Sequence, residues 1–239
     1  MPSKHFSTRP LYLQLRDALA ERVATREWQP GTAIPNEGEL AREFGVAAGT
    51  MRKALDLMEQ EHLLTRRQGR GTFVNDQGSE ELEVRFCNVR AADGNRMRGQ
   101  FKDVEIVETT ANETEQARLR LGAKDRVWRV QRIRVDRNGP FMVEALSLPA
   151  ALFPDLAASE MPMPRLAVLA QRYGILLGKA EERVSIETAT ASVAKALGIA
   201  KGSPVIVLDR VVSALDRRPV EWRIGRCHLA AGHYLAEMR

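Results

Sequence analysis

Two helix patterns followed by a basic hairpin, all within residues 35–74, constrain this chain more than any other feature. Asn36 is a good N-cap for the first helix, and Glu39, three residues later, completes a capping box. Gly45 suits the C-terminal end of that helix. A longer amphipathic helix is predicted just before this segment, from Pro10 to Ala24.

The next helix is predicted from about Ala47 to Glu61. Its apolar residues recur at i, i+3, i+4 and i+7, which places one stripe against a core; they are Met51, Ala54, Leu55 and Met58. When a helix pair lies across a duplex, the early residues of the second helix contact base edges. The outward-facing candidates are Ala48, Gly49, Thr50, Arg52 and Lys53. A solvated helix face is the plainer alternative for these residues.

The segment after this helix predicts a small two-stranded hairpin. Residues 63–65 and 72–74 form its arms, and the turn contains glycines, which take positive φ readily. The turn residues are Gln68, Gly69, Arg70 and Gly71. Arg66, Arg67 and Arg70 crowd the tip, and the stretch from His62 to Asn75 contains no acidic residue, so the tip can contact DNA phosphates. Together these elements predict a winged helix-turn-helix.

Bulk composition adds less than this local pattern. The chain has 239 residues and a formal net charge of +5. Residues 1–76, however, hold 11 Lys/Arg against 10 Asp/Glu, so the placement of charge matters more than its sum. The sequence lacks a secretory signal and any apolar run near the roughly 20 residues that a membrane span needs. Cys87 and Cys227 suit a reducing compartment, so we expect a cytoplasmic protein that has no disulfide and does not bind membranes.

Residues 10–74 resemble the N-terminal domain of the GntR family of bacterial transcription regulators. The resemblance rests on Pro10-Leu11-Tyr12, Pro30-Gly31, Pro35-x-Glu37, Leu40-Ala41, Phe44-Gly45-Val46, Thr50-x-Arg52-x-Ala54-Leu55 and the run from Arg66 to Val74. It implies that DNA is contacted by Asn36 and Glu37, by the helix residues from Ala48 to Lys53 named above, and by residues 66–71. The family usually has Ser at position 47 and Arg or Gln at 48. Ala47 and Ala48 therefore remove a hydroxyl cap and a long polar side chain, which predicts an altered operator preference.

A polar segment at 76–82, containing Gly78 and Ser79, favours a linker between a DNA-binding domain at 1–75 and a second domain at 83–239. In that second domain, a helix, a strand and a hairpin occur twice, leading from Leu121 to Glu144 and again from Leu197 to Glu221. The predicted helices are 112–122, 165–173 and 192–197, and the predicted strands are 127–135, 141–148, 175–188, 204–214 and 219–229. The repeat predicts an α+β domain around an antiparallel sheet, with a ligand cleft between its two halves.

Arginines and glutamates of this repeat are the candidates for lining the cleft. Arg132 and Arg134 share one face of a strand, because side chains alternate with period two. Two guanidiniums together can grip a phosphate or carboxylate. Glu144 lies across the hairpin, and Glu221 and Arg223 offer a comparable set in the second half. Plain cross-strand salt bridges would explain the same residues.

Residues 82–236 resemble the UTRA ligand-binding domain of the HutC branch of GntR regulators, which shares the chorismate-lyase fold. The best-matching stretch is Val127 to Arg134 with Gly139-Pro140 and Glu144, and Pro149, Phe153-Pro154 and Val220-Glu221 also fit. The resemblance implies that Arg132, Arg134, Glu144 and Glu221 face an effector. Arg223 and Tyr234 are added as further effector-binding candidates from the second half.

The combination predicts a homodimeric, sequence-specific DNA-binding regulator, with repression relieved by a metabolite as the expected mode. The effector is expected to be small and anionic, bearing a phosphate or carboxylate. A DNA-binding dimer whose second domain serves only dimerisation is the alternative, and a chorismate-lyase-like enzyme is a third class. No catalytic residue, metal site or cofactor is expected, because His5, His62, His228 and His233 have no metal-ligand spacing and no nucleophile–base motif is present.

Overall fold

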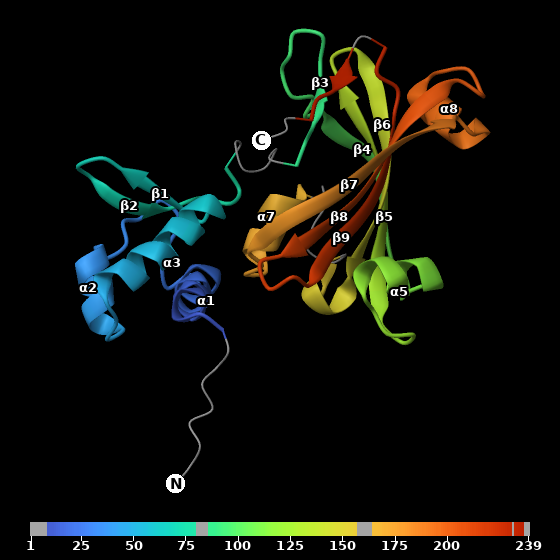
Figure 1. Ribbon diagram of the computed structural model, residues 1–239. Helices are drawn as coiled ribbons and strands as arrows, with labels where there is room; N and C mark the ends of the chain where they lie inside the picture. The colour runs from blue at the N-terminus through green and yellow to red at the C-terminus, as the bar shows by residue number, and fades with distance from the viewer. Residues whose placement is uncertain (1–8, 80–85, 157–163, 231, 237–239) are drawn as a thin grey trace. The chain divides into compact units, whose positions relative to one another are not determined.

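The computed structural model describes residues 9–79, 86–156, 164–230 and 232–236. The chain divides into two compact units (Figure 1). The first unit comprises Met1–Leu82 together with Ala170–Leu176, and the second comprises Glu83–Leu169 and Leu177–Arg239. From residue 80 onward, the predicted linker at 76–82 lies outside the described residues.

The first unit is a three-helix head with a hairpin. Its elements are α1 (Leu11–Ala24), α2 (Glu37–Glu43), α3 (Ala48–Gln60), β1 (Leu64–Arg67) and β2 (Gly71–Val74). The predicted capping box starts α2: Asn36 Oδ1 accepts from Glu39 N at 3.0 Å, and Glu39 Oε2 accepts from Asn36 N at 2.9 Å. The reciprocal bonds satisfy two N–H groups at the start of the helix, which fixes where α2 begins.

Burial follows the apolar stripe expected for the second helix of the pair. Met51, Ala54, Leu55 and Met58 are all buried on α3. Phe44, in contrast, is only half-buried at the end of α2. Burying one side of α3 leaves its early residues on the other side, which is the orientation that a recognition helix needs.

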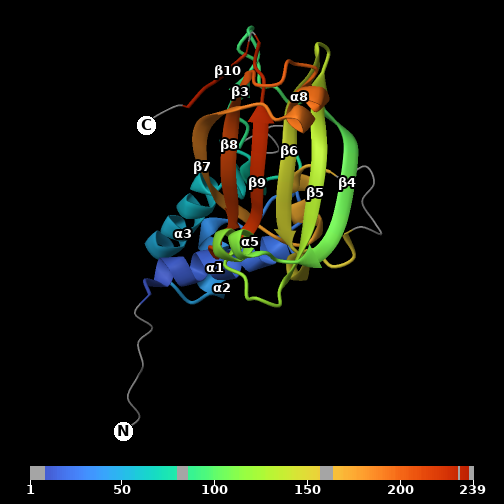
Figure 2. The ribbon, with the colours of Figure 1, turned by 90° about the vertical axis from the view of Figure 1, so that its right-hand side faces the viewer.

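The second unit is built on a six-stranded antiparallel sheet of order β4-β5-β6-β9-β8-β7 (Figure 2). Its strands are β4 (Gln100–Thr110), β5 (Arg126–Asp136), β6 (Gly139–Pro149), β7 (Leu177–Thr188), β8 (Pro204–Ala214) and β9 (Pro219–Cys227). A separate two-stranded pair joins β3 (Val89–Arg90) to β10 (His233–Tyr234). The remaining elements are α5 (Glu113–Leu119), a 3-10 turn at Ala150–Leu152, α7 (Leu166–Arg172) and α8 (Ala191–Leu197).

The sheet order confirms the predicted internal repeat. One half runs β4-α5-β5-β6 and the other β7-α8-β8-β9, and the halves meet where β6 pairs with β9. Figure 2 shows α5 and α8 on the same face of the sheet. Each repeat thus begins with a strand that becomes an outer edge. The sequence predicts β7 but not β4, because β4 is exposed along most of its length and lacks a strong apolar alternation.

The two cysteines are not joined in a disulfide, as the sequence predicts. Cys87 and Cys227 are both free thiols, and burial raises the pKa of the Cys227 thiol to about 12. Among the described residues, the helices are all too short or too polar to cross a bilayer.

Candidate functional site

The start of α3 presents the predicted base-contacting residues. Gly49 and Arg52 are exposed there, and Thr50 is half-buried. Arg52 is held by Glu37 at the start of α2: its Nε donates to Glu37 Oε2 at 3.1 Å and its Nη2 to Glu37 Oε1 at 2.8 Å. The structure therefore brings two DNA-binding candidates together, with the carboxylate of Glu37 fixing the orientation of the Arg52 guanidinium.

Ala47 occupies the N-cap of α3 and makes no side-chain capping bond, as its lack of a hydroxyl requires. Its backbone is already extended, with φ −65° and ψ 142°. Ala47→Ser is therefore expected to stabilise the head by about 0.5–2 kcal/mol, because the hydroxyl can accept an unsatisfied N–H without a backbone change. Urea unfolding followed by Trp28 fluorescence in a background lacking the other two tryptophans measures the gain. Ala47→Val, which also lacks a capping atom, is the control, and an unchanged midpoint in the serine variant would contradict the expectation.

The hairpin, here called the wing and defined as residues 64–74, treats its three arginines differently. Arg66 is tied to α3, with its Nη2 2.5 Å from Asp56 Oδ1 and its Nη1 3.0 Å from Glu59 Oε2. Arg67 lies over the Phe73 ring, 4.6 Å from its centroid. Arg70 is exposed in the turn with no ion-pair partner among the described residues. Gly69 and Gly71 have φ values of 69° and 106°, as predicted for this turn, and Gln68 is exposed beside them.

The second unit contains a pocket that both halves of the repeat line. Its cavity volume is about 30 Å³, inside a wider depression of about 480 Å³ that includes open solvent. Its lining residues are Phe86, Cys87, Arg98, Arg132, Arg134, Arg165, Leu166, Ala167, Arg210, Glu221 and Arg223. Of the six effector-binding candidates, Arg132, Arg134, Glu221 and Arg223 thus line one pocket, and Glu144 and Tyr234 do not.

Glu144 lies beneath the pocket and is completely buried. Its Oε2 accepts from Arg132 Nε at 2.6 Å, and its Oε1 accepts from Arg223 Nη1 at 2.8 Å and lies 3.1 Å from Arg134 Nε. Burial by itself raises the pKa of this carboxyl, but the three guanidiniums outweigh burial and hold the pKa of Glu144 well below its ordinary value. Glu144 is therefore a permanent anion that orients three arginines.

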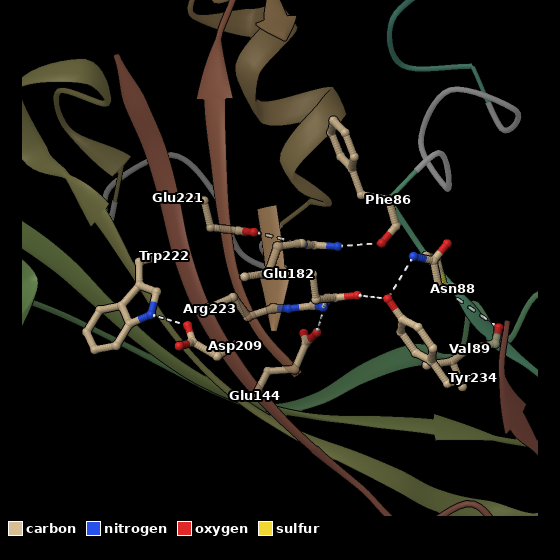
Figure 3. A network of polar contacts seen from close by, with 12 residues as sticks. Phe86, Asn88, Val89, Glu144, Glu182, Asp209, Glu221, Trp222, Arg223 and Tyr234 are labelled. Carbon is tan, nitrogen blue, oxygen red and sulfur yellow. Dashed lines mark hydrogen bonds and ion pairs between the residues drawn. The ribbon is translucent and has the colours of Figure 1, made fainter. Parts of the chain in front are cut away.

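The second half of the repeat continues this polar network (Figure 3). Arg210 donates from Nη2 to Glu221 Oε1 at 3.1 Å and from Nη1 to the Phe86 carbonyl at 2.6 Å. Arg223 also reaches Glu182 on β7, with Nη2 donating to Oε1 at 3.2 Å. These bonds connect β8 to β9 and to the segment before β3, and connect β9 to β7.

Tyr234 belongs to the same network from outside the pocket. Its hydroxyl donates to Glu182 Oε2 at 2.8 Å and accepts from Asn88 Nδ2 at 3.0 Å (Figure 3). Partial burial raises the pKa of the Tyr234 phenol, so it stays protonated and able to donate at neutral pH. Tyr234 therefore orients Glu182, which in turn contacts Arg223.

Positive charge exceeds negative charge in this pocket. Six arginines line it and one glutamate does, while Glu144 and Glu182 contact the arginines from outside the lining. Arg132 Nη1 is buried and has no hydrogen-bond partner among the described residues. Burial lowers the pKa of Arg132 and of Arg210, while Glu144 and Glu221 act in the opposite direction. An anion placed here would meet several guanidiniums, of which Arg132 has one donor without a hydrogen-bond partner among the described residues.

The cross-strand salt bridges that were the alternative reading are also present. Arg132 and Glu144 are directly opposite in the β5–β6 register, and Arg210 binds Glu221 across β8 and β9. The ion pairs are therefore present, four of the candidates also line the pocket, and their role in effector binding stays a prediction.

The sequence did not predict seven of the eleven lining residues, Arg210 among them, nor Phe101 and Glu182, which contact the pocket arginines. Arg210 is the counterpart of Arg132 in the second repeat, so the repeat itself is the signal that could have found it. Phe101 on β4 lies under the Arg132 guanidinium, 3.7 Å from centroid to Cζ. Glu182 carries no sequence signal of its own, because β7 is rich in charged residues and only the register selects this one.

Comparison with known proteins agrees with this architecture. The family model for bacterial regulatory proteins of the gntR family matches residues 11–74, and the UTRA domain model matches residues 95–231. The mannosyl-D-glycerate transport/metabolism system repressor MngR of Escherichia coli (strain K12) is 29% identical over 199 residues, 83% of each chain. The HTH-type transcriptional regulator Rv0792c of Mycobacterium tuberculosis is 30% identical over 217 residues, 89% of this chain and 80% of that one.

A solved structure shares the fold of both units. The crystal structure of PhnF from Mycobacterium smegmatis has a TM-score of 0.55 and 22% identity, and the match covers 94% of this chain and 98% of that one. At this identity the likeness concerns the fold alone. The family models and the relatives go further: the chain belongs to the GntR family of bacterial regulatory proteins, in the HutC branch that joins a helix-turn-helix to a UTRA domain, and it is a transcription regulator.

Proposed function

We propose that this protein is a homodimeric repressor that binds a near-palindromic operator and is released by a small anionic effector. The observation that carries the proposal is the excess of buried arginine over glutamate in the pocket of the second unit. Relatives that are named repressors support the sign of regulation. The effector is bound and released unchanged, so the protein acts as a sensor and not as an enzyme, and it works in the cytoplasm.

In this proposal the pocket residues have distinct roles. Arg132, Arg134 and Arg223 bind the anionic group of the effector, since all three line the pocket and a guanidinium can grip a carboxylate or phosphate with two hydrogen bonds. Glu221 orients Arg210 and accepts from an effector hydroxyl. Glu144 acts through the arginines that it holds, and Tyr234 acts through Glu182.

The head reads the operator through two surfaces. Arg52, positioned by Glu37, reaches a base edge from α3, with Gly49 and Thr50 allowing close approach. Arg67 and Arg70 of the wing contact phosphates or the minor groove. Two heads would occupy half-sites about one helical turn, or roughly 34–36 Å, apart. In this proposal residues 1–75 form the DNA-binding domain, residues 76–82 the linker, and residues 83–239 the effector-binding and dimerisation domain.

Effector binding is tested by thermal unfolding with a panel of small anions that carry a phosphate or one or two carboxylates. A true effector at 100 times its Kd should stabilise the protein by about 2.7 kcal/mol. Arg134→Gln should abolish that shift. Arg129→Gln, on the same strand but bound to Glu115 on the other face, is the matched control and should keep the shift. Stabilisation by no anion in the panel would favour the dimer whose second unit binds no effector.

Operator binding is tested by selecting DNA sites from genomic fragments with the purified protein. A palindromic site is expected, and Arg52→Ala should broaden the set of recovered sequences because a base contact is lost. Adding the effector should weaken operator binding by a coupling of about 1–3 kcal/mol. Recovery of a single asymmetric half-site bound by one chain would contradict the dimeric arrangement.

A further inference from the structure

β7 is an outer strand of the six-stranded sheet and exposes two large apolar side chains. It pairs with β8 on one side only, at the end of the strand order. Val184 is 48% exposed and Ile186 is 75% exposed. An uncovered edge with exposed β-branched residues is a template for pairing with another strand, and proteins normally block such edges unless they use them.

We propose that β7 pairs antiparallel with β7 of a second copy of this chain, in the register centred on Ser185. This inference rests on the homodimer in the proposed function and names the surface that forms it. In that register Arg183 lies opposite Glu187 of the other copy, and Val184 lies opposite Ile186 of the other copy. Because the pairing is two-fold symmetric, each of these contacts occurs twice.

The side chains fit this register on both faces of the sheet. Val184 and Ile186 share the face of Glu182, so the apolar pairs add to the pocket side. Arg183 is exposed and has no ion-pair partner among the described residues. Glu187 accepts from Arg226 Nε through Oε2 at 3.0 Å, which leaves Oε1 for a second cation. Opposite charges and β-branched residues facing each other stabilise an antiparallel pair.

Neighbouring registers fit less well. Centring the pair on Val184 would put Glu181 opposite Glu187, and like charges directly opposite are destabilising. Centring it on Ile186 would put Arg183 opposite Ala189 and leave the guanidinium without a carboxylate. Of these three registers, only the one centred on Ser185 places both an apolar pair and an opposite-charge pair directly across from each other.

The opposite edge of the sheet is protected from the same pairing. The β4 strand has a register shift between Lys102 and Glu105, and Asp103 there has φ 51°, so the strand is bent. Beyond the shift, residues 104–110 contain Glu105 and Glu108 but no lysine or arginine. No antiparallel register of this segment with itself yields an opposite-charge pair, which leaves β7 as the edge suited to a second copy.

The pairing also reaches the pocket network. Glu182, which binds Arg223 and Tyr234, lies three residues from the proposed two-fold axis. A change in how Glu182 is held on effector binding would therefore be transmitted along the shared strands of both copies.

Disulfide trapping tests the register directly. Directly opposite residues in an antiparallel pair have Cα atoms about 4.5–5.5 Å apart, within the 4.4–6.8 Å range that a disulfide spans. Ser185→Cys in the full-length protein should therefore give a covalent dimer on mild oxidation. The native protein, with Cys87 and Cys227, and Val107→Cys on β4 are the controls and should stay monomeric on a denaturing gel. Val184→Cys mixed with Ile186→Cys should cross-link more than either alone.

Charge exchange tests the same surface in solution. Arg183→Glu and Glu187→Arg should each raise the dimer dissociation constant at least tenfold in sedimentation experiments, because each places like charges opposite. An equimolar mixture of the two variants should restore dimers as a heterodimer. A native dimer with no Ser185→Cys cross-link and no charge effect would overturn the β7 interface and leave the proposed function standing. A native protein that is monomeric, with or without operator DNA, would overturn both.

Discussion

Glu144→Gln is expected to destabilise the second unit by about 3–5 kcal/mol, the usual cost of removing one partner from a buried ion pair. The carboxylate is completely buried and faces Arg132, Arg134 and Arg223. Glutamine keeps the volume and one acceptor oxygen but removes the one negative charge that, within the described parts of the chain, contacts all three guanidiniums. Their positive charges would then repel one another in a poorly solvated site.

The measurement is urea unfolding followed by tryptophan fluorescence in a Trp28→Phe background, in which Trp128 and Trp222 of the second unit are the only reporters. The two units need not unfold together, so a reporter confined to one of them is required. Glu181→Gln removes an exposed partner of Lys179 on the same sheet and is expected to change little. If Glu144→Gln lowered the free energy of unfolding as little as this control does, the buried arginines would not need the Glu144 carboxylate for stability.

The pH dependence of the same pair of proteins has a defined sign. The folded-state pKa of Glu144 is depressed well below its ordinary value of 4.5. A depressed carboxyl pKa contributes stability that is fully present above the unfolded-state pKa and is lost as the pH falls through the folded-state pKa. The gap in unfolding free energy between native protein and Glu144→Gln should therefore be constant from pH 5 to 8 and should narrow below about pH 4.5. A gap that widened in acid would contradict the assigned charge state.

Local patterns predicted the head almost completely. A capping box at Asn36, an apolar stripe on α3 and a glycine turn at 68–71 each act within a few residues, so sequence spacing alone carries them. What spacing did not reveal is the pairing across elements. The α2 carboxylate of Glu37 holds Arg52, and Asp56 and Glu59 of α3 hold Arg66; both depend on how helices and wing pack.

The second unit was predictable where the sequence repeats itself. The repeat indicated an antiparallel sheet with two helices on it and nominated Arg132, Glu144 and Glu221. Glu144 and Glu221 occupy equivalent positions in the sequence repeat. Glu144, however, is completely buried in contact with three arginines, whereas Glu221 lines the pocket. That difference arises from register: Glu144 lies opposite Arg132, whereas Glu221 lies opposite Val212 and reaches Arg210 diagonally. Register over long hairpins with bulges is set by packing, which a single sequence does not display.

The different contacts of the wing arginines lead to unequal expected effects on DNA binding. Arg67→Ala combined with Arg70→Ala should lower the slope of log affinity against log salt by about 1.8, since each neutralised phosphate contributes about 0.9. If affinity extrapolated to 1 M salt is unchanged, this loss corresponds to roughly 60-fold weaker operator binding at 0.1 M salt. Both guanidiniums are available, because Arg67 lies over the Phe73 ring with no ion pair to any described residue, and Arg70 is exposed.

Arg66→Ala should lower the same slope by much less than 0.9, because Asp56 and Glu59 already compensate its charge. Its effect should instead be a loosened wing, seen as faster amide exchange in β1 and β2. Lys124→Ala with Lys201→Ala removes the same charge as the double wing variant from exposed sites on the second unit, and the slope should stay unchanged. The contrary outcome is that substituting Arg66, Arg67 and Arg70 by alanine one at a time lowers the slope equally. That result would show that Arg66 leaves Asp56 and Glu59 and binds a phosphate in the DNA complex. The ion pairs on α3 would then belong to the free protein only, and operator binding would have to break them first.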